Sequence, residues 1–142
     1  MRRSISRCLI VPALFALTSA ACGDNLSTTT PTDTTPTTTT TETFSGAINR
    51  NGAATHTFTA ARSGSVTVTL KTLSPDGGLT VGLSLGTWNG ESCQTVIARD
   101  TTVVGNSIVG TASAAGNFCI RVYDAAGKLV ESTSYDVQVI HP

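Results

Sequence analysis

The chain has 142 residues, a formal net charge of zero and only 13% charged residues, so it offers no basic surface of the kind that binds nucleic acid or anionic lipid. Its length allows one compact domain with appended segments. Aromatic residues make up only 5% of the chain, while Thr, Ser, Gly and Ala are abundant, a composition that favours short strands joined by tight turns.

Residues 1–21 are typical of a signal peptide. Arginines near the start precede an apolar stretch from Leu9 to Leu17, and small residues follow from Thr18 to Ala21. A transmembrane helix needs about 20 apolar residues, so this stretch is too short to span a bilayer. A buried core helix is disfavoured because Pro12 interrupts the stretch. The sequence therefore predicts export and removal of residues 1–21.

The residues at the end of this segment resemble the lipobox of bacterial lipoproteins. Ser19-Ala20-Ala21-Cys22 carries the resemblance, although the family usually has Leu where Ser19 stands. In that family the cysteine sulfur takes a diacylglycerol, and two or three acyl chains anchor a protein stably. We therefore expect lipidation of Cys22 and a membrane anchor. Simple cleavage after Ala20 or Ala21, which yields a soluble protein, is the alternative.

The cysteine count supports lipidation. Cys8 leaves with the signal peptide, and if Cys22 carries lipid, Cys93 and Cys119 remain as a pair. Such a pair forms a disulfide in an oxidising compartment. Cys119 alternates with apolar neighbours that fill the core, so we expect the bridge on a solvent-side face or at a sheet edge.

Residues 22–43 form the predicted tether. The run from Ser27 to Thr43 consists mainly of Thr with Pro31 and Pro36, and it has no apolar side chain to bury in a core. We expect it to be disordered, because nothing offsets the entropy of ordering it. Placed after a lipidated cysteine, it would hold the following domain clear of the membrane.

Residues 44–142 form one predicted all-β domain. Four segments alternate apolar with polar residues, the pattern of strands with one face on a core and one towards solvent, and four others are weaker candidates. The clear segments are 65–71, 79–85, 117–122 and 135–139, and the weaker ones are 44–48, 55–60, 95–100 and 107–112. Turn residues such as Asn51-Gly52 separate them. About eight short strands predict an antiparallel β-sandwich.

The order of these segments resembles the bacterial pre-peptidase C-terminal domain family. The residues that carry the resemblance are Phe44-Ser45-Gly46, Thr57-Phe58-Thr59, the run from Ser63 to Leu70, the run from Ala115 to Tyr123, and the run from Tyr135 to Val139. Members of the family are jelly-roll-like β-sandwiches appended to secreted peptidases and other exported proteins. The resemblance implies that fold for this chain and implies little about function.

The sequence predicts no enzyme. Its only histidines are His56, in a short strand, and His141, at the penultimate position, which make a poor catalytic pair. No HExxH, GxSxG, Walker or CxxC motif is present in the sequence. We therefore expect no catalytic residues and no cofactor that the sequence can specify.

Calcium is an open alternative, because hard cations take oxygen ligands from loops. The acidic residues in or near the predicted loops are Asp76, Glu91, Asp100, Asp124 and Asp136. They show no DxDxDG-type spacing, and an Asp-Gly pair is first of all a turn former.

Trp88 is the only tryptophan, and it precedes Asn89-Gly90-Glu91 at a predicted hairpin end. An exposed ring there could stack on a sugar, with Asn89 or Glu91 supplying hydrogen bonds. The favoured interpretation is that Trp88 caps the open end of a core made of small side chains. The candidate ligand-binding residues are thus Trp88, Asn89 and Glu91.

Together these features predict a monomeric, non-catalytic lipoprotein of the cell envelope, at the outer membrane or cell surface. It would contact the membrane through its N-terminal lipid and display a β-sandwich that binds a glycan or a protein, but no nucleic acid. The alternatives are a calcium-dependent carbohydrate- or matrix-binding module and a passive structural protein with no specific ligand. For localisation, the alternative is a soluble secreted or periplasmic protein.

Overall fold

The computed structural model describes residues 38–142, and this part of the chain is an antiparallel β-sandwich, which confirms the predicted fold class. The predicted signal peptide, Cys22 and residues 22–37 of the predicted tether lie outside the described residues. The strands are β1 (Thr40–Ile48), β2 (Ala53–Ala60), β3 (Gly64–Ser74), β4 (Val81–Trp88), β5 (Cys93–Thr102), β6 (Ser107–Ala112), β7 (Gly116–Tyr123) and β8 (Thr133–His141). Between residues 38 and 142, no helix has the length and apolar character needed to cross a membrane.

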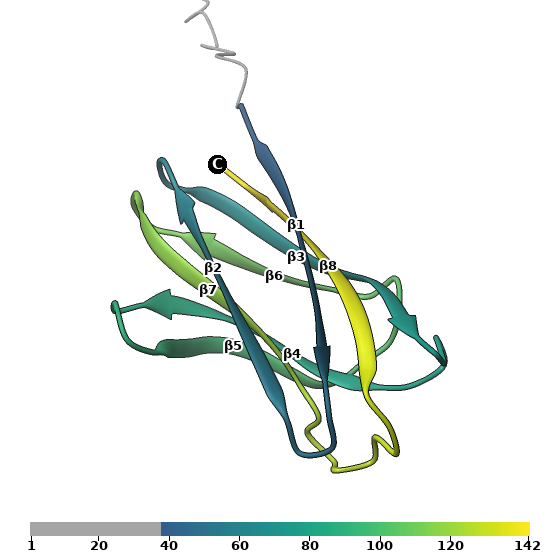
Figure 1. Ribbon diagram of the computed structural model, residues 1–142. Coiled ribbons are helices and arrows are strands. Elements are labelled where there is room, and N and C mark those ends of the chain that lie inside the picture. Colours follow the sequence, from purple (N-terminus) through teal and green to yellow (C-terminus); the bar gives the residue numbers. More distant parts are fainter. Residues whose placement is uncertain (1–37) are drawn as a thin grey trace, which may run out of the picture. The chain divides into compact units, whose positions relative to one another are not determined.

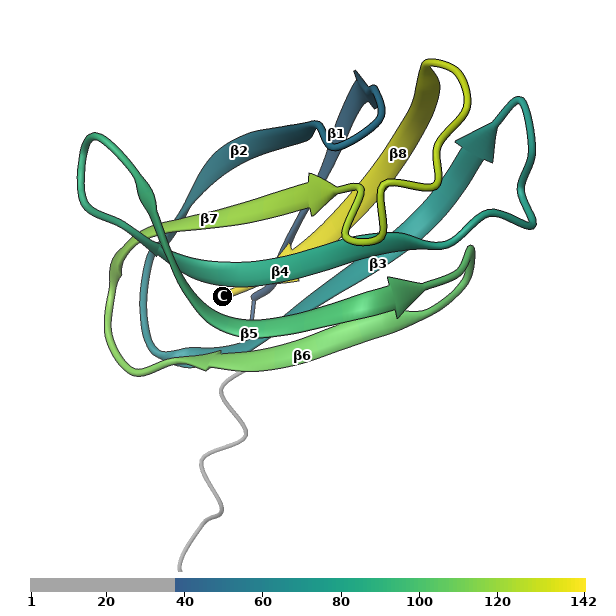
Figure 2. The same ribbon diagram turned by 90° about the horizontal axis from the view of Figure 1, so that it is seen from below.

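The strands form two four-stranded sheets that pack face to face (Figures 1 and 2). Sheet A has the order β1-β8-β3-β6, and sheet B has the order β2-β7-β4-β5. The first strand thus pairs with the last, the second with the seventh, and the fourth with the fifth, all antiparallel. This nested pairing is that of a jelly roll, in which the chain folds as one long hairpin rolled into two layers.

The core lies between the sheets and is built from medium-sized aliphatic side chains. Successive side chains of a strand point to opposite faces, and the alternating segments place their apolar residues inward as predicted. The fully buried large side chains of the core include Val66, Val68, Leu70, Leu83, Ile120, Val122, Leu129, Val137 and Val139. Tyr135 is the largest of these buried side chains, and it packs over the bare backbone of Gly46.

The domain begins four residues earlier than predicted. Strand β1 starts at Thr40, whereas residues 40–43 were assigned to the tether. These residues pair with the end of β8, and the side chain of Glu42 contacts His141 with a distance of 2.8 Å between Oε1 and Nε2. The partners that order this polar stretch lie about 100 residues away in sequence, so local composition gave no sign of them.

Strand β4 departs from the predicted pattern of one core face and one solvent face. All residues from Val81 to Gly86 are buried, including Gly82 and Ser84, for which the alternation predicts the solvent face. Tyr123 covers Gly82, because a Cβ at that glycine would lie 2.3 Å from its ring. The outer face of sheet B is therefore covered over β4, by the Tyr123 ring at Gly82 and by the backbone of Gln94 at Gly86.

Candidate functional site

The Cys93–Cys119 disulfide pins the β4–β5 hairpin onto the outer face of sheet B. The bond is formed as predicted, and the two Cα atoms are 5.7 Å apart. Yet Cys93 begins β5 and Cys119 lies in β7, and β4 runs between these two strands. Strands two places apart in a sheet are separated by about 9.6 Å. The start of β5 must therefore fold over β4, and Figure 2 shows this crossing.

Gly86 permits the crossing. A Cβ at this position would lie 2.1 Å from the backbone oxygen of Gln94, so any side chain would collide with the overlying strand. The pairing of β4 with β5 is irregular here, with a shift between Leu85 and Gly86. A bulge of this kind bends a strand out of the sheet. We call residues 88–93 the pinned hairpin.

A hollow of about 390 Å³ opens between the pinned hairpin and the outer face of sheet B. We call it the hairpin hollow. The residues that line it are Thr55 from β2, Arg121 from β7, and Trp88, Glu91, Ser92 and Cys93 from the hairpin. Thr55 and Arg121 are directly opposite each other in the register of β2 and β7. The hollow thus has the paired strands β2 and β7 as its floor and a cross-linked hairpin as its wall.

Trp88 lies in this wall and not on the core. It is half-buried, and it pairs with Cys93 in the register, so its side chain shares the outer face with the disulfide. It belongs neither to the buried core nor to the partly buried side chains packed against that core. The interpretation of Trp88 as a core cap is therefore wrong. The alternation of β4, with Leu83 and Leu85 inward, already places position 88 outward.

Asn89 shapes the turn of the hairpin. Its Oδ1 accepts hydrogen bonds from the backbone N–H of Glu91 at 2.9 Å and of Ser92 at 2.8 Å, the geometry of an Asx turn. Asn89 does not line the hollow, whereas Trp88 and Glu91 do. Of the three predicted ligand-binding residues, the structure thus brings two to one site and gives the third a conformational role.

Arg121 is the residue of this site that the sequence analysis missed. Its side chain is half-buried, and its Cζ lies 6.0 Å from the ring centroid of Tyr123, within the range of a cation–π contact. No carboxylate of residues 38–142 forms an ion pair with it. The alternation of β7 was a usable signal, because it places Arg121 and Cys119 on the same outer face.

The Tyr123 ring packs beside the Arg121 guanidinium and is itself held by a hydrogen bond. Its hydroxyl donates a 2.6 Å hydrogen bond to Oδ1 of Asp100 in β5. Burial, the hydrogen bond to Asp100 and the negative charge of that residue raise the pKa of Tyr123 to about 12. The phenol therefore stays neutral at physiological pH and holds its ring beside Arg121. The Ser84 side chain, opposite Arg121 in the register, is buried, and its Oγ has no hydrogen-bond partner among the described residues.

The acidic residues considered for calcium are spread over the domain. Within residues 38–142, no three His, Cys, Asp or Glu side chains come together in a way that could hold a metal ion. Asp76 accepts a hydrogen bond from the backbone N–H of Gly78, as a turn former does. Oδ1 of Asp136 accepts a hydrogen bond from the Ser45 hydroxyl, and its Oδ2 accepts one from Thr72.

Asp124 holds the β7–β8 loop. It is buried, and its carboxylate accepts hydrogen bonds from the backbone N–H groups of Asn51, Lys128 and Leu129 at 3.1–3.2 Å. Burial alone would raise the pKa of Asp124, but these backbone hydrogen bonds outweigh it, and the pKa is lowered. This carboxylate therefore has a structural task.

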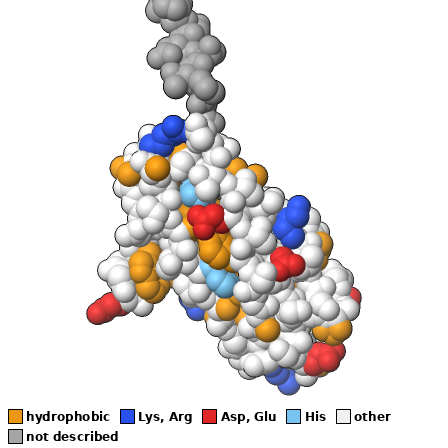
Figure 3. All heavy atoms as spheres, turned by 45° about the horizontal axis from the view of Figure 1, so that its top comes forward, with side chains coloured by type: hydrophobic (Ala, Val, Ile, Leu, Met, Phe, Trp, Pro, Cys, Tyr) orange, Lys and Arg blue, Asp and Glu red, His pale blue; other side chains and the backbone are white. Residues whose placement is uncertain are grey.

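The two histidines lie along the edge where β1 meets β2, each with its own partner. The His56 Nε2 is 2.8 Å from the Tyr135 hydroxyl, and its ring stacks on Phe44. His141 contacts Glu42, and its ring packs against Phe58. Histidine, acidic and hydrophobic side chains gather on one face of the domain in Figure 3. Burial lowers the pKa of His56, which favours a neutral ring in the packed edge.

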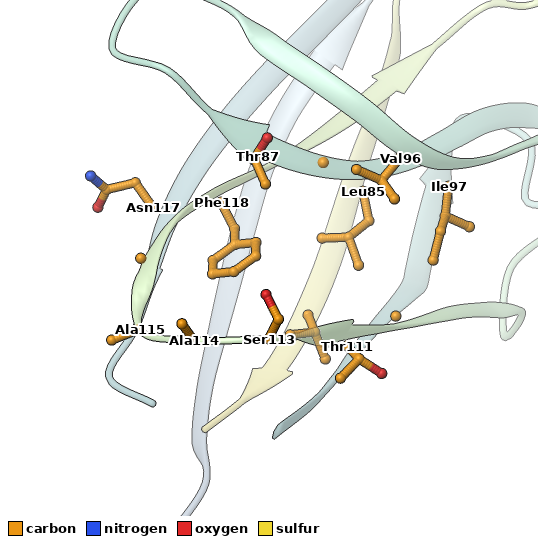
Figure 4. Close-up of a pocket in the computed structure, with 14 residues that line it drawn as sticks. Leu85, Thr87, Val96, Ile97, Thr111, Ser113, Ala114, Ala115, Asn117 and Phe118 are labelled. Carbon is orange, nitrogen blue, oxygen red and sulfur yellow. The ribbon is translucent and has the colours of Figure 1, made fainter. Parts of the chain in front are cut away.

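A second hollow, also of about 390 Å³, lies between the sheets where β5 and β6 form their outer edges. In Figure 4, Leu85, Ile97 and Phe118 point into it from sheet B, and the β6–β7 loop with Ser113 closes the opposite side. None of its lining residues is charged. The hairpin hollow differs because it combines a tryptophan ring with a positive and a negative side chain.

Comparison with known proteins finds a solved structure with a similar fold but no matching family. No model of a protein family matches the chain, and no curated protein matches it either. Among solved structures, the chain is similar to PliG of Aeromonas hydrophila, a periplasmic inhibitor of g-type lysozyme, with a TM-score of 0.50 and 16% sequence identity. The alignment covers 70% of this chain and 83% of PliG. At this identity the likeness shows a shared fold.

Proposed function

We propose that this chain is a non-catalytic binding module of the bacterial cell envelope and that it binds its ligand in the hairpin hollow. The observation that carries this proposal is the meeting of Trp88, Arg121 and Glu91 around one hollow. Binding sites typically combine an apolar wall with a few polar groups that orient the ligand. The disulfide holds the wall in place before a ligand arrives, which reduces the entropy lost on binding.

The absence of enzyme activity is part of the proposal. Both histidines are engaged in packed hydrogen-bonded pairs at the β1–β2 edge, His56 with Tyr135 and His141 with Glu42. A general base must instead reach a proton of the substrate. The envelope location rests on the signal peptide and on the lipobox ending in Cys22, and residues 22–39 would serve as the tether.

Calorimetric titration against a panel of neutral and acidic oligosaccharides tests the binding function. We expect at least one to bind, and the Trp88→Ala variant to bind it at least about tenfold more weakly with an unchanged melting temperature. A loss of about 1.4 kcal/mol corresponds to that factor. Equal binding by both proteins would overturn the placement of the site, and binding of no oligosaccharide would rule out a sugar as its ligand. Val96→Ala, a change at an exposed position outside the hairpin hollow, is the control.

A protein partner is the second candidate, and the fold shared with PliG favours one specific probe. PliG inhibits a g-type lysozyme, so the same calorimetry should include such a lysozyme, together with an assay of its cell-wall hydrolysis. Inhibition that Trp88→Ala abolishes would support a protein-binding role for the hairpin hollow. No inhibition at tens of micromolar would remove this candidate.

A further inference from the structure

We propose that the hairpin hollow binds a sugar ring that carries one carboxylate, an inference that rests on the proposed function and names its ligand class. Three groups converge there, each suited to a different part of such a ligand: the Trp88 ring, the Arg121 guanidinium and the Glu91 carboxylate. The hydroxyl of Thr55 completes the polar lining.

The Trp88 ring suits the face of a sugar. The face of an aromatic ring is negative, and the C–H groups on one face of a pyranose carry partial positive charge. A half-buried indole on a fixed hairpin can receive such a face without first being ordered. The edge of the same sugar presents hydroxyls, which Thr55 can bind as donor or acceptor and Glu91 as acceptor. The arrangement therefore favours a ring with an apolar face and a polar edge.

Arg121 suits a carboxylate. A guanidinium donates two parallel hydrogen bonds to a carboxylate, which makes this pair stronger and more directional than a contact between neutral groups. In residues 38–142 no carboxylate forms an ion pair with Arg121. Its Cζ lies 6.0 Å from the centroid of the Tyr123 ring, a contact that adds no negative charge to the guanidinium. The guanidinium beside Trp88 should therefore bind a sugar that carries a carboxylate more tightly than a neutral sugar.

Glu91 limits the charge of the ligand. It is exposed on the same hollow as Arg121, and a like charge close to it costs energy. A ring with two sulfate groups, or a ring with a doubly charged phosphate, would bring a second negative charge of the same ring towards Glu91. One carboxylate on a ring can face Arg121 while its hydroxyls face Glu91, so the pair of opposite charges selects a singly charged ring.

The test compares trigalacturonate with the same trimer after reduction of its carboxylates to alcohols. Trp88 is the only tryptophan of the chain, so its fluorescence reports binding at the hollow directly. We expect trigalacturonate to bind at least about tenfold more tightly than the reduced trimer, since a hydrogen bond to a charged group contributes more than a neutral one. Raising the salt concentration should weaken only the acidic trimer.

Variants then assign the difference to Arg121. Arg121→Gln should abolish the preference for the acidic trimer, and Arg121→Lys, which keeps the charge without the fork, should retain part of it. Lys71→Gln removes an equal charge from an exposed position on β3 of the other sheet and should leave the preference unchanged. A thermal melt of each variant shows whether it is folded. If Arg121→Gln is not folded, Arg121→Lys takes its place, and a preference as large as that of the unmodified protein would contradict the role of Arg121.

Three results would overturn the inference: equal affinity for both trimers, a preference that survives Arg121→Gln, or no binding of either trimer. The first differs from a failure of the proposed function. If both trimers bind equally and Trp88→Ala loses both, as measured by calorimetry, the hollow remains a binding site and only the selection of a carboxylate fails.

Discussion

Removal of the Cys93–Cys119 disulfide should destabilise the domain and release the pinned hairpin. The two cysteines are 26 residues apart in sequence, and for a loop of this length the chain-entropy relation gives a loss of about 3.5 kcal/mol at 25 °C. For a domain of about 100 residues, each kcal/mol shifts the melting temperature by roughly 4–8 °C. We therefore expect a fall of roughly 14–28 °C in the Cys93→Ala, Cys119→Ala double variant.

The assay is urea unfolding at 25 °C, monitored by Trp88 fluorescence. Both the disulfide-bonded protein and the double variant carry Cys22→Ser, which removes a third thiol. The native double variant should also emit at longer wavelength, because Trp88 leaves the outer face of sheet B when the hairpin is free. The intact chain treated with a reductant is the control, and it should reproduce the double variant. A loss of stability under about 1 kcal/mol with unchanged emission would refute the reasoning, because other contacts would then hold the hairpin.

Gly82→Ala should lower the free energy of unfolding in urea by about 1–3 kcal/mol, because its Cβ would lie 2.3 Å from the Tyr123 ring. A loss below about 0.5 kcal/mol, the size of a typical surface change, would mean that the ring moves aside freely. Ser84→Ala should be neutral or stabilise by up to about 1 kcal/mol, since it removes a buried hydroxyl without a partner, and a clear loss of stability would reveal a hydrogen bond. The pKa of Asp124 is lowered in the fold, so its contribution to stability is present above the unfolded pKa of about 3.9 and is lost as the pH falls through the folded pKa. Asp124→Asn should therefore lower the melting temperature at pH 7 and flatten the loss of stability below about pH 4. Identical plots of stability against pH for the two proteins would contradict this. Mass spectrometry of the mature chain should find an acylated Cys22 as its first residue, and an unmodified or different first residue would refute the anchor.

The strands could be predicted because each needs only a local pattern. Alternation of apolar and polar residues places Val66, Val68 and Leu70 in the core whatever the partners are. The start of β1 at Thr40 could not be found this way, since its first residues have no apolar side chain. Their order comes from β8, which is nearly the whole domain away in sequence.

The candidate site was only partly accessible from the sequence. Alternation along β4 and β7 places Trp88 and Arg121 on outer faces, which argues against a core cap at Trp88. The meeting of these two residues could not be predicted, because it depends on the hairpin folding across β4. That fold requires the bare backbone of Gly86 and the bond to Cys119, and neither leaves a periodic signal.

NMR chemical-shift mapping on ¹⁵N-labelled protein tests whether the hairpin hollow is the binding site. Trigalacturonate or a g-type lysozyme, whichever binds, would be titrated in. We predict that the largest shifts occur at Thr55, Arg121 and the indole N–H of Trp88. Shifts centred instead on Ser113 and Phe118, in the hollow between β5 and β6, would contradict the assignment of the site.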